Sequence, residues 1–272
     1  MGGRPGRADA VLAVFAEELK LARNAAGLTQ EQLAVKIAYS TALVGAVETC
    51  RRVASRDFAL RCDEVLGTGG VLGRLHRLVA GHAYPSWFRP FVELEAGATS
   101  LRSWEPLLVP GLLQIEHYAT AVLRAARPAD PDDRVQQDVG ARMERQAVLA
   151  SDEPPMLWTV LDESVLRRPI GGPQVMYAQL AYLAEAAEQP KIMIQVMPLG
   201  VGAHTGLTGG FVIATFRDGT DSLYVETASA GLIVGRPEAV ASCAFNFDAL
   251  RAEALSSTAS LDRIRKVMKE WT

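Results

Sequence analysis

Residues 28–52 read LTQEQLAVKIAYSTALVGAVETCRR, and their pattern sets the architecture expected for the N-terminal part of the chain. Thr29 and Gln32 have the spacing of a capping box, in which the hydroxyl accepts from the amide three residues on and the glutamine side chain reaches back. The next apolar residues recur at helical spacing: Leu33, Ala34 and Ile37. The pattern therefore predicts a short amphipathic helix that begins just after Thr29.

A second short helix is predicted after a break at Tyr39–Ser40. Ser40 is a suitable N-cap residue, since its side-chain oxygen can accept from an amide of the first turn. The apolar pattern then restarts with Leu43, Val44 and Val47. Two short helices joined by a turn of about four residues have the geometry that sets the second helix into the major groove of DNA. The alternative is a helical hairpin within a larger α-domain, and we favour DNA binding.

The charge balance differs between the two parts of the chain. The 272 residues suffice for two ordinary domains, and a hydrophobic content of 49% is ample for buried cores. Residues 1–82 hold 11 Lys and Arg against 8 Asp and Glu, whereas residues 83–272 hold 17 against 23. A mildly basic domain over 1–82 and an acidic domain over 83–272 fit a nucleic-acid reader joined to a second module.

Cysteine usage and hydropathy indicate a cytoplasmic protein. Cys50, Cys62 and Cys243 are odd in number and follow no metal-ligand spacing, which indicates reduced thiols. The N-terminal segment MGGRPGRADA is polar, is expected to be flexible, and lacks the apolar core of a signal peptide. No uncharged apolar run reaches the length of about 18 residues that a membrane-spanning helix needs, so we expect no membrane association.

Five helices are predicted over residues 10–82, enough for a small all-α bundle that folds around one core. The first covers about 10–25, the next two are those described above, Ser55 can cap the fourth, and the fifth begins near Val71. Cys62 is expected in the core of this bundle. The segment GHAYPSWFRP, residues 81–90, marks the domain boundary, and its three aromatic residues are expected to pack against the second domain.

Residues 83–272 show mixed periodicity, which predicts an α+β domain. Extended structure is expected at 98–109 and helices at about 112–127, 131–150, 173–188, 236–254 and 258–271. Short β-branched runs bounded by Gly, Pro and Asp predict four strands, in MLWTVLDESVLRR, KIMIQVMPL, GGFVIATF and SLYVETASAGLIV. Asp218–Gly219 is expected to join the last two as a hairpin.

Candidate DNA contacts follow from the predicted helix pair. The residues expected to face the bases are Ser40, Thr41, Ala42, Gly45 and Ala46. None of them is Arg, Asn or Gln, the side chains that bind guanine or adenine bidentately, so we expect sequence preference from a few apolar contacts and from DNA shape. Backbone phosphates are expected near Thr29 and Gln30 and at Arg51, Arg52 and Arg56. The alternative for the three arginines is a solvated loop.

The segments AAGLTQEQLAVKIAYS and VGAVETCRR resemble the Xre family of helix-turn-helix regulators. That family typically ends its recognition helix with Ile-x-x-Ile-Glu-x-Gly, and Val44, Val47 and Glu48 occupy the matching positions here. Cys50 stands where glycine is usual. Either Cys50 adopts a left-handed conformation at a cost of about 1 kcal/mol, or the turn after the helix differs.

Further segments resemble a large actinomycete (actinobacterial) group of WhiJ-like regulators: RDFALRCDEVLGTGGVLGRL, LRSWEPLLVPGLLQIEHYATAVL, ARMERQAVL and GAHTGLTGGFVIATF. The resemblance covers the chain from about residue 15 onward and implies a transcriptional regulator paired with a small companion protein, with an antitoxin-like C-terminal domain of unassigned activity. The expected fold is α+β overall: a lambda-repressor-like five-helix bundle followed by a mixed α+β domain.

The second domain carries no recognisable catalytic or metal-binding pattern. Its histidines lack ligand spacing, and the glycine-rich loop at 200–206 is followed by a strand, whereas a phosphate-cradling loop would precede a helix. We therefore expect no enzyme activity, no metal and no cofactor. A ligand or partner pocket would form if a set of polar and aromatic residues converges. That set is Arg102, Trp104, Gln114, His204, Thr205 and Glu226.

Three functions remain in view. The leading hypothesis is a dimeric, sequence-specific transcriptional regulator that binds double-stranded DNA as a homodimer, with a small-molecule effector or a small companion protein bound to its C-terminal domain. The second is an antitoxin-like interaction module that holds a partner protein and autoregulates its own operon. The third is an enzyme fused to a DNA-binding head, which the absence of a nucleophile–base pair disfavours.

Overall fold

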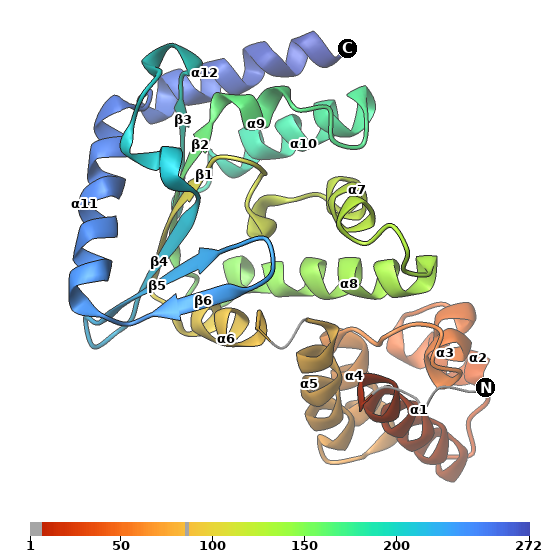
Figure 1. Cartoon of the computed structure of the whole chain (residues 1–272). Helices are drawn as coiled ribbons and strands as arrows, with labels where there is room; N and C mark the ends of the chain where they lie inside the picture. Colours follow the sequence, from red (N-terminus) through yellow and green to blue (C-terminus); the bar gives the residue numbers. More distant parts are fainter. Residues whose placement is uncertain (1–6, 85–86) are drawn as a thin grey trace. The chain divides into compact units, whose positions relative to one another are not determined.

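The computed structural model of the chain describes residues 7–84 and 87–272. It divides into two compact units (Figure 1). The N-terminal unit comprises Met1–Pro85 with Arg127–Glu144, and the C-terminal unit comprises Ser86–Ala126 with Arg145–Thr272. Residues 127–144, which lie beyond the predicted domain boundary at 82/83, thus group with the helical bundle. The expectation of a flexible N-terminus falls largely on residues 1–6, which lie outside the described residues, as do residues 85 and 86 of the predicted boundary segment.

The N-terminal unit contains the predicted five-helix bundle. Its helices are α1 (Arg7–Ala25), α2 (Gln30–Ile37), α3 (Thr41–Glu48), α4 (Arg56–Leu66) and α5 (Val71–Ala83). The apolar faces read from the sequence meet in one core. Fully buried side chains there include Phe15, Leu33, Val44, Phe58 and Leu72. Cys62 is also buried in this core, as predicted.

The first four helices of this bundle each end at a residue with left-handed backbone geometry. These residues are Gly27, Ala38, Cys50 and Gly67, with φ between 58° and 68°. After α3, the amide of Arg51 donates to the carbonyl of Ala46 (2.8 Å) and that of Cys50 to Val47 (3.1 Å), the pattern of a Schellman motif. The chain therefore makes the turn that glycine usually makes, with Cys50 in the strained conformation.

Helix α5 receives its N-terminal cap from a neighbouring helix. Its own N-cap, Gly70, makes no side-chain hydrogen bond. The carboxylate of Asp63 on α4 instead accepts from the amides of Leu72 (2.9 Å) and Gly73 (2.8 Å), and also from the hydroxyl of Thr68. Since the first-turn amides of a helix have no partner inside it, this buried carboxylate ties α4 and α5 into one body.

Helix α8 (Asp132–Arg145) supplies the remaining part of the N-terminal unit. The Tyr84 hydroxyl donates to the carbonyl of Ala141 (2.6 Å), and His76 Nε2 lies 3.3 Å from Glu144 Oε2. Asp138 is buried and forms an ion pair with Arg127. The helix predicted at 131–150 is thus present over most of its length, and residues 146–150 continue as a short 3-10 helix, η2.

The C-terminal unit is built on a six-stranded mixed sheet with the order β3-β2-β1-β4-β5-β6. The strands are β1 (Ser100–Glu105), β2 (Met156–Asp162), β3 (Ile192–Met197), β4 (Phe211–Thr215), β5 (Asp221–Glu226) and β6 (Gly231–Val234). The pairs β1–β2 and β2–β3 are parallel, and the other neighbours are antiparallel. The two parallel connections each contain helix, as parallel neighbours require.

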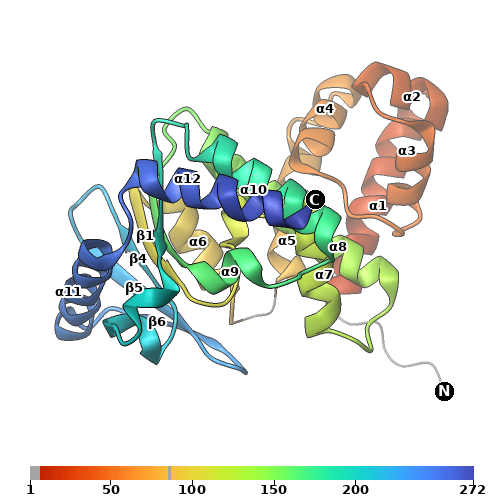
Figure 2. The ribbon, with the colours of Figure 1, turned by 90° about the horizontal axis from the view of Figure 1, so that it is seen from above.

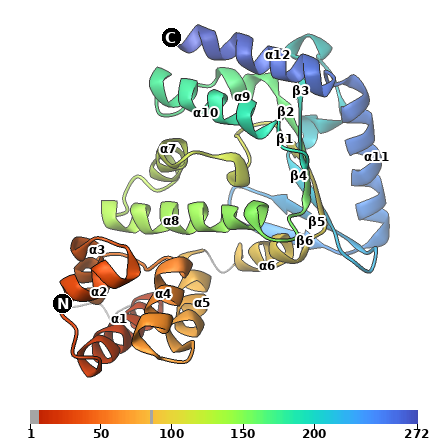
Figure 3. The ribbon, with the colours of Figure 1, turned by 180° about the vertical axis from the view of Figure 1, so that it is seen from behind.

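Helices cover both faces of this sheet (Figures 1, 2 and 3). Helix α11 (Pro237–Glu253) packs on one face, against Trp104 and Val160. Helices α10 (Pro173–Ala186) and α12 (Ser257–Met268) pack on the other, against Leu101 and Leu161. The unit also contains α6 (Arg89–Gly97), α7 (Glu116–Ala126) and α9 (Glu163–Arg167). Because side chains alternate along a strand, β1 contributes to both cores.

Three glutamines hold the irregular segment VPGLLQ, residues 109–114. Gln114 Nε2 donates to the carbonyl of Val109 (2.7 Å), and Gln179 Nε2 donates to that of Leu113 (2.7 Å). Gln146 Nε2 donates to the carbonyls of Gly111 and Gln114. Side-chain amides replace the ladder of hydrogen bonds that this buried main chain lacks, so the motif has a structural role.

Several predicted elements differ in detail from the structure. The helix expected at 112–127 begins at Glu116, because Pro110 opens a 3-10 helix, η1, over Gly111–Leu113. The run MLWTVLDESVLRR is extended only to Asp162, which caps α9 by accepting from the amide of Ser164 (2.8 Å). The run SLYVETASAGLIV turns at residues 227–230 and forms two strands, β5 and β6.

The predicted hairpin is confirmed. The expected packing of the boundary aromatics against the second domain is confirmed for Phe88 but is wrong for Tyr84, whose hydroxyl bonds to α8 within the N-terminal unit. Gly219, with φ 80°, lies in the turn between the antiparallel strands β4 and β5. Phe88 packs against Phe91 (ring centroids 5.3 Å apart) and Tyr224 (6.1 Å) within the C-terminal unit. Among the helices that the structure describes, none is both long enough and apolar enough to cross a bilayer.

Replacing Ala38 by glycine is expected to stabilise the protein. Ala38 is exposed and has φ 58°, so glycine would remove the left-handed strain without loss of packing. We expect a gain of about 0.5–1 kcal/mol in the free energy of unfolding, measured by chemical denaturation. The control Lys36→Gly, also exposed but inside α2, should lose about 1 kcal/mol. Equal losses from both substitutions would contradict the role assigned to Ala38.

Candidate DNA-binding interface

Local capping sets the ends of the α2–α3 pair, as the sequence predicts. Thr29 Oγ1 accepts from the amide of Gln32 (3.1 Å), and Gln32 Oε1 accepts from the amide of Thr29 (2.9 Å). Ser40 Oγ accepts from the amide of Leu43 (3.2 Å) at the start of α3. These bonds satisfy orphan amides within each helix, so both helices begin at defined residues.

A buried ion pair fixes the end of α3 against α1 and α2. Arg23 Nε and Nη2 donate to the two carboxylate oxygens of Glu48 at 2.5 and 2.9 Å. Gln30 Nε2 also donates to this carboxylate (2.8 Å), and Arg23 Nη1 donates to the carbonyl of Leu28 (2.7 Å). The Glu48 side chain is 2% exposed. Bidentate pairing of a guanidinium with a carboxylate constrains orientation as well as distance, so α3 has one position relative to α1.

The same contacts set the charge state of the pair. Burial alone would raise the pKa of Glu48, but the hydrogen bonds from Arg23 and Gln30 outweigh it, and the pKa is lowered overall. The hydrogen bond to Glu48 raises the pKa of Arg23. Both groups are therefore held in their charged forms at neutral pH.

Tyr39 anchors the turn between α2 and α3. Its ring packs edge-on against Phe58 (centroids 5.3 Å apart), and the guanidinium of Arg61 lies over the ring at 5.8 Å. Its hydroxyl donates to Asp57 (2.9 Å) and lies 3.2 Å from Ser55 Oγ. The turn is thus fastened to the start of α4, and the first turn of α3 stays clear of the core.

The exposed part of α3 is small and uncharged. Ser40, Thr41 and Ala42 are exposed, and no acidic residue lies in the first turn. Gly45 and Ala46, which we expected to face the bases, are half-buried rather than fully exposed. A Cβ at Gly45 would lie 3.3 Å from Gln30 Oε1, because α2 and α3 approach closely there. The side chain of Gln30 is itself engaged by Glu48, so its amide points into the helix pair.

Three of the five residues predicted to contact phosphates lie close together along the chain after α3. Arg51, Arg52 and Arg56 are exposed, on the loop between α3 and α4 and at the first residue of α4. The amides of Arg51 and Arg52 both donate to the carbonyl of Ala46, at 2.8 and 3.2 Å. The backbone of the first two arginines is therefore fixed to α3 while their side chains reach solvent, an arrangement suited to phosphate contact.

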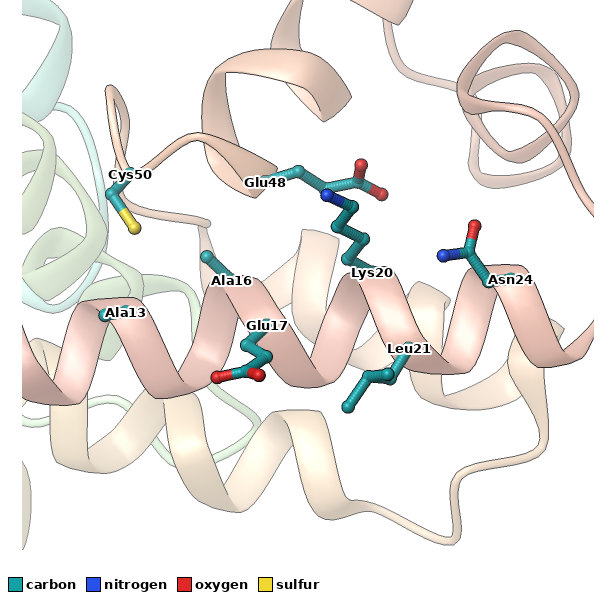
Figure 4. Close-up of a pocket in the computed structure, with 8 residues that line it drawn as sticks. All are labelled: Ala13, Ala16, Glu17, Lys20, Leu21, Asn24, Glu48 and Cys50. Carbon is teal, nitrogen blue, oxygen red and sulfur yellow. The ribbon is translucent and has the colours of Figure 1, made fainter.

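An open cleft of about 400 Å³ lies between α1 and the end of α3 (Figure 4). The side chain of Lys20 extends toward Glu48, and its charge contributes to the lowered pKa of that carboxyl. Cys50 lines the cleft, and burial raises the pKa of its thiol. The other lining residues are Ala13, Ala16, Glu17, Leu21 and Asn24. None of the residues predicted to contact DNA lines this cleft.

Three of the six residues proposed for a second-domain pocket lie together. Trp104 Nε1 donates to the carbonyl of Gly206 (2.8 Å), and its ring packs edge-on against His204 (centroids 5.1 Å apart). His204 Nδ1 accepts from the amide of Gly206 (3.2 Å), and the Thr205 hydroxyl donates to the carbonyl of Asn246 (3.2 Å). These contacts fasten the loop before β4 to β1 and α11.

The remaining three residues of that set do not join this cluster. Arg102 pairs with Asp221 (2.7 Å), across the sheet from β1 to β5. Gln114 is buried with VPGLLQ on the other side of the sheet from Trp104. Glu226 is exposed at the end of β5 and accepts a long hydrogen bond from Tyr224 (3.5 Å). The six side chains therefore do not converge on one site.

Buried charges in the C-terminal unit were not identified from the sequence. Glu95 and Arg145 are both buried and form an ion pair of 3.1 Å between Oε1 and Nε. Burial raises the pKa of Glu105 to about 8; a hydrogen bond from Ser103 opposes the shift, and the charge of Glu226 adds to it. No group of His, Cys, Asp or Glu among the described residues has the geometry to hold a metal ion.

Two family models together account for most of the chain. A helix-turn-helix domain matches residues 14–87. A domain of unknown function, DUF5753, matches residues 88–266. The chain belongs to the DUF5753 family. No curated protein and no solved structure matches it. The N-terminal unit of this DUF5753 protein is thus a helix-turn-helix domain, which indicates a DNA-binding regulator.

The Arg23–Glu48 pair makes the N-terminal unit of this DUF5753 protein sensitive to acid. Because the folded-state pKa of Glu48 is lowered, its stabilising contribution is present above its ordinary pKa of 4.5 and is lost as pH falls through the folded value. Glu48→Gln should destabilise α1–α3 by about 3 kcal/mol at pH 7 and reduce this pH dependence. Hydrogen exchange of α1–α3 peptides, corrected for intrinsic rates, measures both effects. The control is Glu17→Gln, at an exposed position of α1. If the stability of the two variants depended on pH in the same way, the role of Glu48 would be refuted.

Glu105 gives the DUF5753 domain the opposite pH dependence. Because its folded-state pKa is raised, the folded state binds more protons than the unfolded state between pH 4.5 and about 8, and stability falls as pH rises through that range. Glu105→Gln should raise the melting temperature at pH 8 by a few degrees and change it less at pH 5. All four tryptophans lie in the C-terminal unit, so their fluorescence reports this unfolding. The exposed control Glu93→Gln should show no such pH-dependent gain; an equal gain would contradict the assignment.

Proposed function

We propose that this DUF5753 protein is a sequence-specific transcriptional regulator that binds double-stranded DNA as a homodimer through α3. The observation that carries the proposal is the surface around this helix. Its first turn is exposed, small and free of acidic residues, and exposed arginines follow directly after it. A second helix of this kind, held rigidly by a first, suits insertion into the major groove.

The expected mode of recognition follows from the available side chains. Thr41 offers one hydroxyl and Ala42 offers a methyl group for a thymine, whereas no exposed Arg, Asn or Gln lies on the first turn of α3. Arg51, Arg52 and Arg56 would contact phosphates and fix the register of the helix in the groove. Discrimination between sequences would then depend strongly on DNA shape and half-site spacing.

The C-terminal unit would provide control by binding. The resemblance to Xre-family and WhiJ-like regulators supports a small companion protein or a small-molecule effector as its partner, without catalysis by this unit. A regulator of this kind acts on DNA in the cytoplasm. The antitoxin-like alternative, in which the main task is to hold a partner protein, gives a different first result in the experiment below.

The decisive test is to incubate the purified full-length protein with fragmented genomic DNA from its source and to sequence what is retained at moderate salt. An enriched inverted repeat is the expected result and would identify the operator. Retention without sequence preference, or no retention, would contradict the proposal as stated. Co-purification of a small protein with the chain would then favour the antitoxin-like module.

Neutralising Arg51 and Arg52 tests the phosphate contacts directly. The double variant Arg51→Ala/Arg52→Ala should bind all sequences more weakly, and the slope of log affinity against log salt should fall by about 4 for the dimer, because each of its two subunits releases two fewer counterions. Fluorescence anisotropy at several salt concentrations measures this slope. The control Arg217→Ala/Arg265→Ala makes the same charge change on the C-terminal unit and should leave the slope unaltered. An unchanged slope in the first variant would place these arginines away from DNA.

A further inference from the structure

The two edges of the six-stranded sheet differ in how their main-chain groups are used. At the β3 edge, the carbonyl of Val196 accepts from the amide of Leu255 (2.9 Å), and the amide of Val196 donates to Ser260 Oγ (2.9 Å). At the β6 edge, no described residue forms a hydrogen bond with the outer side of the strand. The β3 edge is thus bonded by the chain itself at Val196, whereas the outer groups of β6 have no hydrogen-bond partner among the described residues.

The hairpin that joins β5 to β6 determines which groups of β6 point outward. The amide of Thr227 donates to the carbonyl of Ala230 (2.8 Å), which makes these two residues a hydrogen-bonded pair. Hydrogen-bonded and non-hydrogen-bonded pairs alternate along an antiparallel ladder. Leu232 and Val234 therefore bond to β5, while the N–H and C=O groups of Gly231 and Ile233 face away from the sheet.

The side chains of β6 leave this edge apolar. Leu232 is 54% exposed and Ile233 is 41% exposed, and the two point to opposite faces of the sheet. The strand GLIV carries no charge and no proline. Natural proteins commonly protect a sheet edge with charged residues, proline or a covering element. Helix α6 contacts β6, but among the described residues none forms a hydrogen bond with the outer side of the strand.

We propose that β6 pairs antiparallel with β6 of a second copy of this chain, across a two-fold axis at Leu232. In this register Gly231 of each copy lies opposite Ile233 of the other, and the outward N–H and C=O groups of both residues are satisfied in both copies. Leu232 meets its symmetry mate in a non-hydrogen-bonded pair, with Cα atoms about 4.5 Å apart. The pairing makes one continuous twelve-stranded sheet from the two six-stranded sheets.

Charges at the ends of the strand favour a second copy as the occupant. Exposed Glu226 lies beside the first residue of β6, since it pairs with Gly231, and exposed Arg236 follows two residues after the last. In the proposed register Arg236 of each copy lies opposite residue 228 of the other, in the turn that follows Glu226, so charges of opposite sign lie at the same end of the paired strands without forming a direct ion pair. The edge is thus complementary to itself in hydrogen bonding, in hydropathy and in the sign of its end charges.

The expected association is modest. Four strand residues from each copy bury much less than the roughly 800 Å² per partner of a standard stable interface, so we expect a dissociation constant in the micromolar range. A DNA site with two half-sites would raise the effective concentration of the two copies and favour the same contact. The inference itself rests on the sheet edge and does not require the proposed function.

A cysteine substitution tests the register in the full-length chain. Leu232→Cys places two thiols in a facing non-hydrogen-bonded pair, within the distances that a disulfide requires. Mild oxidation should convert most of this variant to a covalent dimer on non-reducing gels. The matched control is Leu207→Cys, which is 68% exposed and lies away from the edge, and the wild-type chain reports any reaction of its native cysteines. Cross-linking of Leu232→Cys no greater than that of the control would overturn the proposal.

Sedimentation velocity then tests the hydrogen bonds of the edge. Ile233→Pro removes an outward N–H while leaving the bonds between β5 and β6 in place, since proline is tolerated on edge strands. We expect the dissociation constant to rise at least tenfold, with tryptophan fluorescence and thermal unfolding unchanged. A wild-type chain that stays monomeric at about 100 μM, or a dimer unaffected by Ile233→Pro, refutes the sheet-edge contact. Selective retention of genomic DNA by such a protein would still support the proposed function, so the two failures are distinguishable.

Discussion

The buried pair between Arg23 and Glu48 is the interaction on which the N-terminal unit depends. It joins the last turn of α1 to the last residue of α3, and Gln30 brings α2 to the same carboxylate. Burying two charges has a desolvation cost, so the pair is not simply a source of stability; removing one partner, however, leaves an uncompensated charge in the core. Its main consequence is geometric, because the bidentate contact allows only one orientation of α3.

That geometry also limits how the protein can recognise DNA. The approach of α2 to α3 leaves little space at Gly45, where an added Cβ would lie 3.3 Å from Gln30 Oε1. Gln30 carries an amide of the kind that reads adenine, but its Nε2 donates to Glu48 in the ion-pair network. The small set of base-reading groups follows from the sequence of α3 itself, and in the proposed mode of binding it leaves DNA shape a large share of the specificity.

Local signals made part of this structure predictable from the sequence. The capping box at Thr29 and the caps at Ser40 and Ser55 involve residues three apart, so spacing alone reveals them. The Arg23–Glu48 pair spans 25 residues, and the Glu95–Arg145 pair spans 50, distances at which a sequence pattern does not specify contact. Similarly, the turn at 227–230 lacks Gly, Asn or Asp, the residues that normally mark a two-residue hairpin, so β5 and β6 looked like one strand.

The contacts of the C-terminal unit bear on how it could respond to a partner. Trp104, Gln114 and His204 each use a side-chain polar atom in a hydrogen bond with the main chain of another residue of this unit. A ligand that engaged those atoms would have to replace these bonds, each worth about 1 kcal/mol, before it gained any affinity. The outward N–H and C=O groups of β6 have no such bonds to give up. Association at the sheet edge therefore requires less rearrangement than entry of a ligand into the interior. The proposed two-fold pairing of β6 would also give the protein the symmetry of a DNA site with two inverted half-sites.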